Sequence, residues 1–193
     1  LKLIERTIEQ SRRDVAKASA QPLLVWGGLV LSTSLIIWLL ITNTPKGEGG
    51  GSWHLLWILM TLIGGIYQYY FNRSWSVPDT IVSRTIGYMW GVFGISVFVL
   101  WAINICAITF GGISVRQIIP MTPTIILFMG LSVAVTGLVI NRLFISVIGA
   151  VACAICSYFS LVNQGVNELL CVAVTAVFTL IVPGLYLKFS NGR

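Results

Sequence analysis

The 193-residue chain is 56% hydrophobic and only 9% charged, with a mean hydropathy of +0.91. Soluble domains carry about 25% charged residues, so this composition excludes that class and indicates a membrane protein. At about 20 residues per span, the chain can cross a bilayer several times but has no room for a separate soluble domain. The formal net charge of +6 could reflect either a nucleic-acid partner or the orientation of the chain in the membrane.

The first twenty residues, "LKLIERTIEQSRRDVAKASA", predict an amphipathic helix, because the charged residues lie outside one arc of about 100° on a helical projection. We expect residues 1–20 to form a separate juxtamembrane helix on an anionic membrane surface, or a docking surface for a cytoplasmic partner. Pro22 suits the first turn of the next helix. The expected membrane-surface anchors are Lys2, Arg6, Arg12, Arg13 and Lys17.

Residues 21–193 predict a single domain of six transmembrane helices. Apolar runs of about membrane-spanning length lie at roughly 22–42, 53–71, 85–110, 118–140, 143–162 and 169–189. The stretch "PLLVWGGLVLSTSLIIWLLI" does not alternate in polarity, which indicates helices rather than barrel strands. Pro78, Asp79 and Thr80 read as a turn and helix cap before the third run. The predicted fold is therefore all-α: a polytopic six-helix protein with an N-terminal amphipathic helix.

The distribution of basic residues predicts the orientation. With the N-terminus inside, ten of the twelve Lys and Arg residues lie on the inner side, and only Lys46 and Arg116 lie outside. Both termini are then cytoplasmic, and Trp53 and Tyr88 belong to aromatic belts at opposite faces. We expect an integral protein of a bacterial plasma (inner) membrane. The net positive charge therefore reflects the orientation of the chain in the membrane and does not indicate nucleic-acid binding.

A weak internal repeat appears in the odd-numbered spans. Trp26, Ser32 and Trp38 in the first span are spaced nearly as are Trp90, Ser96 and Trp101 in the third. This similarity favours a hypothesis of three helical hairpins that arose by duplication. They would be related by a pseudo-threefold axis along the membrane normal, unlike the inverted repeats of many transporters.

The fifth span contains the pair "CAIC" within a stripe of small and polar residues. On a helical projection, one face gathers Ser146, Gly149, Cys153, Cys156, Ser157 and Ser160, with Arg142 at its inner end. Small residues let membrane helices approach closely, so we interpret the stripe as an interface with the fourth span. The rival hypotheses are a narrow hydrated path or a lipid-headgroup site.

Redox and metal chemistry are weaker interpretations of the two thiols. A metal site needs about four ligands, yet Cys106 and Cys171 are single and His54 is the only histidine. A disulfide within one helix turn would be strained. We therefore expect no metal and no cofactor.

Function follows less directly from the sequence. The predicted spans carry no ionisable side chain at mid-membrane depth and no Ser-His, paired Asp or His-Glu constellation, so an enzyme is not expected. We expect a non-catalytic membrane subunit, scaffold or regulator, with the lipid bilayer, a cytoplasmic protein or a second copy of the chain as partners. The alternative is a passive channel or transporter for a small solute or lipid, favoured by the polar stripe and by Pro120, Pro123 and Pro183.

Overall fold

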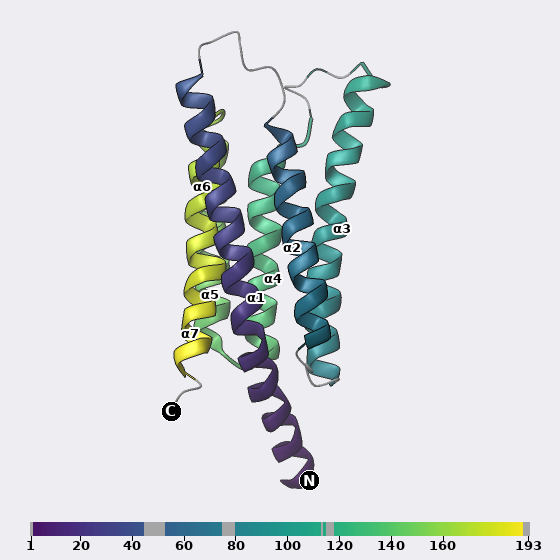
Figure 1. Cartoon of the computed structure of the whole chain (residues 1–193), viewed down its shortest axis with the longest axis vertical. Coiled ribbons are helices and arrows are strands. Elements are labelled where there is room, and N and C mark those ends of the chain that lie inside the picture. The colour runs from purple at the N-terminus through teal and green to yellow at the C-terminus, as the bar shows by residue number, and fades with distance from the viewer. Residues whose placement is uncertain (1, 45–52, 75–79, 113, 115–117, 191–193) are drawn as a thin grey trace.

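A computed structural model describes residues 2–44, 53–74, 80–112, 114 and 118–190, and the regular structure in these ranges is helical (Figure 1). The first three helices are α1 (Lys2–Asn43), α2 (His54–Ser74) and α3 (Ile81–Thr109). They are followed by α4 (Met121–Val139) and α5 (Leu143–Val162). The last helical path consists of α6 (Glu168–Ala176), a π-helical turn η2 (Val177–Ile181) and α7 (Val182–Ser190). The prediction of an all-α fold is confirmed.

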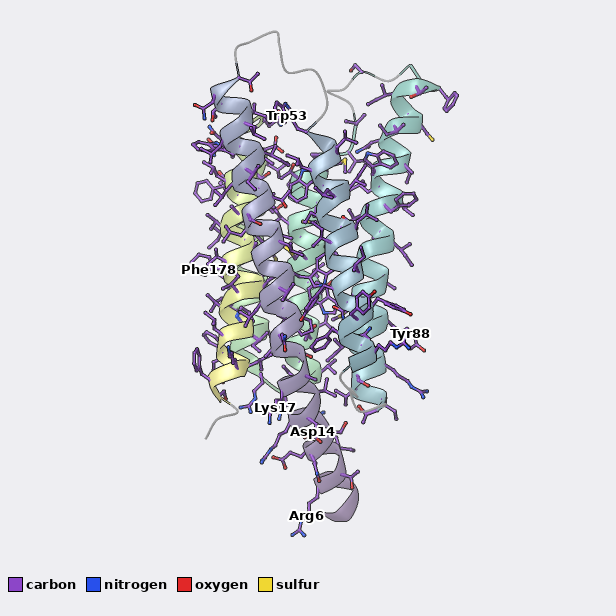
Figure 2. All side chains as sticks on the ribbon, viewed as in Figure 1. Arg6, Asp14, Lys17, Trp53, Tyr88 and Phe178 are labelled. Carbon is purple, nitrogen blue, oxygen red and sulfur yellow. The ribbon has the colours of Figure 1, made fainter. Side chains whose placement is uncertain are left out.

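The helices lie side by side along the long axis of the molecule (Figure 1). Both ends of the described chain lie toward one end of the bundle, together with the end of α2, the start of α3 and the α4–α5 turn. We call this the basic end, because α2 and α7 finish there with Arg73 and Lys188, and Arg142 lies in the α4–α5 turn. Trp53 and Tyr88 lie toward opposite ends of the bundle (Figure 2).

Among the described residues, five helical stretches are long and apolar enough to cross a membrane: Arg6–Asn43, Ile81–Thr109, Met121–Val139, Leu143–Val162 and Glu168–Ser190. Their outer faces are covered with exposed apolar side chains, as lipid contact requires. Length and composition therefore indicate an integral membrane protein. The predicted second span forms a helix, α2, but it does not meet the same criterion, because its last two turns contain Tyr67, Gln68, Tyr69, Tyr70 and Asn72.

The structure corrects the predicted boundary between the N-terminal segment and the first span. Residues 2–43 form one helix of 42 residues, and Pro22 lies inside it rather than in a first turn. Val15 and Ala16 are only 2% and 1% exposed, and they pack in the same apolar core as Leu23. Burial on both sides of Pro22 offsets the lost backbone hydrogen bond. The segment consequently extends beyond the bundle as a continuation of α1 and does not lie across its end (Figure 1).

The three prolines that favoured the channel or transporter alternative, Pro120, Pro123 and Pro183, do not unwind the helices at their positions. Pro120 precedes α4 and Pro123 lies in its first turn, where a missing backbone N–H costs little. Pro183 follows the π-helical turn, in which the Val182 N–H donates to the Val177 carbonyl. This wider turn relieves the clash that a proline ring makes with the preceding turn, so the helix continues to Ser190.

Threonine 80 confirms the predicted helix cap before α3. Its hydroxyl accepts a hydrogen bond from the Ser83 N–H at 3.2 Å, and the Ser83 hydroxyl accepts one from the Thr80 N–H at 3.1 Å. This reciprocal capping box begins α3 at Ile81, four residues before the predicted position. Pro78 and Asp79 lie outside the described residues.

Close helix contacts at glycines hold two parts of the bundle together. A Cβ atom added to Gly137 of α4 would lie 2.6 Å from the Ser146 N of α5, and one added to Gly149 would lie 3.1 Å from the Ala134 N. A Cβ added to Gly27 of α1 would lie 2.9 Å from the Leu180 Cβ of η2. These distances are too short for any other residue without movement. Glycine therefore permits the α4–α5 contact and the packing of α1 on the last helical path.

The remaining helices, α2 and α3, are peripheral. On α2, Gly64 lies under the Trp26 ring of α1, and the Trp26 Nε1–H donates to the Gln68 Oε1 at 3.3 Å. On α3, a Cβ added to Gly87, Gly91 or Gly94 would meet no atom within 4 Å. Within the described ranges, α2 and α3 do not pack on each other as α4 and α5 do. The contacts between successive hairpins are therefore not equivalent, which counts against a pseudo-threefold arrangement, and the duplication itself stays a prediction.

The two kinds of glycine provide a matched test of this packing. We expect Gly137→Leu to lower the free energy of unfolding by about 1–3 kcal/mol, because the new side chain must separate α4 from α5. Gly91→Leu on α3 should have little effect, since its position is open. Thermal unfolding in mild detergent measures both. Equal midpoints for the two variants would contradict the packing argument.

Candidate functional site

The stripe predicted on the fifth span forms the contact face of α5. Apart from Ile145, the buried residues of α5 are its predicted members Ser146, Gly149, Cys153, Cys156, Ser157 and Ser160. Cys153 lies directly against Gly130 of α4. Two hydroxyls cross the interface: Ser146 Oγ donates to the Ala134 carbonyl at 2.8 Å, and Ser157 Oγ donates to the Pro123 carbonyl at 3.0 Å. The face therefore combines close backbone approach with interhelical hydrogen bonds.

This geometry limits the chemistry available to the stripe. Direct contact between Gly130 and Cys153, and between Gly137 and Ser146, leaves no water-filled gap between α4 and α5 at these levels. The Cys153 thiol donates to the Ala150 carbonyl at 3.1 Å, and all four cysteines are free. Within the described ranges, no three or more His, Cys, Asp or Glu side chains are grouped so that they could hold a metal ion. Ser160 is different, because its buried hydroxyl has no hydrogen-bond partner in the described part of the protein.

Arg142 is positioned by the three-residue turn, Ile140 to Arg142, that joins α4 to α5. Asn141 adopts the left-handed conformation, with φ = 58°, which asparagine tolerates better than most residues. The Arg142 N–H donates to the Gly137 carbonyl at 2.7 Å, and the Asn141 N–H donates to the Leu138 carbonyl at 3.0 Å. These two bonds form a Schellman motif, which closes α4. The Arg142 side chain is thereby held at the basic end.

A pocket of about 390 Å³ at the basic end brings Arg142 together with α1. The α4–α5 turn lines it with Ile140, Asn141 and Arg142, and the end of α7 contributes Ser190. The remaining lining comes from α1, namely Glu9, Arg12, Arg13, Asp14, Ala16 and Lys17. Figure 2 shows Asp14 and Lys17 where α1 leaves the bundle, with Arg6 nearer the N-terminus. Three segments that are distant in the sequence therefore form one charged site.

The pocket has an excess of positive charge. Four basic side chains face two carboxylates, and one carboxylate is already paired, since Arg13 Nη2 lies 2.6 Å from Glu9 Oε1. That pair is largely exposed and joins neighbouring turns of one helix, so it stabilises little. Arg12 Nε is buried and has no hydrogen-bond acceptor among the residues that the structure describes. Within the described part of the chain, Lys17 and Arg142 also make no ion pair.

The structure regroups the predicted site residues. Arg12, Arg13 and Lys17, expected on a separate surface helix, share the pocket with Arg142, which was assigned to the α5 stripe. Arg6 is exposed and does not line the pocket, and the Lys2 side chain lies outside the described part. The sequence placed all these residues on one side of the membrane. It carried no signal that α1 lies beside the α4–α5 turn.

Comparisons with protein-family models, with curated proteins and with solved structures find no match to this chain. We therefore infer its function from the geometry of its own residues.

The Asn141 turn provides a test of how Arg142 is positioned. We expect Asn141→Val to reduce stability by about 1–2 kcal/mol, because a β-branched residue is strained at positive φ. Asn141→Gly should be neutral or slightly stabilising. Midpoints of thermal unfolding in detergent distinguish them, and a tolerated valine would show that the turn does not depend on this conformation.

Proposed function

We propose that the chain is a non-catalytic component of a bacterial plasma membrane, a subunit, scaffold or regulator, with both termini in the cytoplasm. Its working surface is the basic end. The observation that carries this proposal is the continuity of α1: the helix that packs in the bundle also projects its charged turns beyond it. The orientation rests on the distribution of Lys and Arg residues.

The projecting part of α1 is suited to contact a cytoplasmic protein. Val15 and Ala16 are buried in the apolar core, so the base of the projection is fixed to the bundle. Beyond them, Arg6, Glu9 and Gln10 are exposed. A helix that is held at its base loses less conformational entropy on binding than a free segment would, which favours recognition.

The contacts of the α5 stripe favour a subunit, scaffold or regulator over a channel or transporter. Its small residues lie against α4 backbone, and the Ser146 and Ser157 hydroxyls are hydrogen-bonded to α4 carbonyls. A hydrated path needs polar groups that remain available to water or solute. Transport by this face would therefore require α4 and α5 to separate.

Site-specific photo-cross-linking in native membranes tests the partner surface. A photoreactive amino acid at Gln10, on the projection, should give one discrete protein adduct. The same amino acid at Phe178, which is exposed on the apolar side of the bundle, should give lipid adducts only. An adduct with the mass of a second copy would identify the partner as the chain itself. A pattern that is the same at both positions would contradict the proposal.

Solute flux tests the channel alternative. Purified protein reconstituted into liposomes should allow no faster release of small ions or neutral solutes than protein-free liposomes. The Gly137→Leu variant, in which α4 and α5 are forced apart, serves as a control for leakage through a damaged bundle. Saturable flux through the wild-type protein, distinct from any non-saturable leak through Gly137→Leu, would overturn the scaffold proposal.

A further inference from the structure

The pocket at the basic end has a composition that the scaffold role does not require. Arg12, Lys17 and Arg142 converge on it from two separate segments, and within the described chain none of them has an anionic partner. Asp14 is the one lining carboxylate that is not already in an ion pair. Like charges brought together without counter-ions repel one another, so the arrangement is favourable when an anion is bound.

We propose that this pocket binds a phosphate group, either the headgroup phosphate of an anionic phospholipid or a free phosphate. Guanidinium groups match phosphate oxygens with a planar fork of N–H donors, and the pocket lining contains three arginines and one lysine. The Arg12 Nε–H is buried and has no acceptor among the described residues, so turning this side chain toward a bound phosphate would break no hydrogen bond that the structure shows. The volume of about 390 Å³ is within the range of small-ligand pockets.

The level of the pocket favours a lipid as the source of the phosphate. It lies at the turn between two membrane-spanning helices, where α4 ends at Val139 and α5 begins at Leu143, which is the depth expected for headgroups. Ile140 and Ala16 provide an apolar part of the lining. Leu143 and Phe189, the sequence neighbours of Arg142 and Ser190, are exposed on the bundle surface, where acyl chains would lie.

This inference is separate from the scaffold proposal, because binding in detergent requires neither a protein partner nor a particular orientation. The measurement is native mass spectrometry of the full chain, delipidated in mild detergent and titrated with dioleoyl phosphatidylglycerol. We expect one bound lipid, with phosphatidylcholine binding at least about fivefold more weakly, since its headgroup is neutral overall. Higher salt should weaken binding of the anionic lipid.

Variants of the lining locate the site. The double variant Arg12→Gln/Arg142→Gln should weaken phosphatidylglycerol binding roughly 25-fold, or about fivefold for each cation removed. The single variant Lys17→Gln, at an exposed position, should weaken it about fivefold and serves if the double variant does not fold. Arg73→Gln removes the same charge from the same end outside the pocket and should bind as the wild type does.

Inorganic phosphate distinguishes the two sources. If about 10 mM phosphate displaces the lipid or binds by itself in a manner that Arg12→Gln/Arg142→Gln abolishes, the pocket accepts free phosphate. If it does not compete, the pocket recognises the lipid headgroup. If Arg73→Gln weakens phosphatidylglycerol binding as much as the lining variants do, the proposal is overturned, because attraction of the anionic lipid would then be a general property of the basic end. Equal binding of both lipids, without any phosphate binding, would overturn it as well.

Discussion

Close backbone approach at glycine is the constraint on which the rest of this structure depends. Lipid tails are as apolar as the side chains between helices, so burial of apolar surface does little to favour helix association within a bilayer. Contact distance matters instead. Gly137 and Gly149 bring α4 and α5 together, and Gly27 and Gly184 bring α1 against η2 and α7. The charged pocket depends on both contacts, because its lining comes from α1, from the α4–α5 turn and from the end of α7.

Packing also explains why one part of α1 lies in the apolar bundle while its charged turns extend beyond it. An apolar core at the basic half of the bundle joins Val15 and Ala16 to Met129, Val133 and Leu187. This core continues past Pro22, so the first helix remains straight enough to carry its charged turns outward from the apolar bundle. A free amphipathic helix would have settled on a membrane surface. Burial of two small side chains changes the segment into a projection that borders the pocket.

The sequence predicts the residue types of the candidate site but not how its segments come together. The residue types of the α5 stripe were recognisable because helical periodicity is local, and α5 does bury that face. The basic residues of α1 were also recognisable as a group. Their meeting with Arg142 depends on the position of α1 relative to a turn about 130 residues later in the chain, and no local pattern specifies such a contact. Local sequence also does not distinguish Gly91 from Gly137, since each is a glycine within an apolar helix. Only the structure shows that Gly91 is open and that Gly137 lies in a tight contact with α5.

The sequence by itself determined that this protein is helical and suited to a membrane, and it located most helix ends. Those properties follow from hydrophobic run length, capping residues and glycine or proline signals, all of which act over a few turns. Tertiary structure decided the rest. It made α1 one helix through Pro22, left α2 and α3 at the periphery and assembled the pocket. Each of these outcomes depends on contacts between distant segments, whose energies are set by how side chains fit and not by their order in the chain.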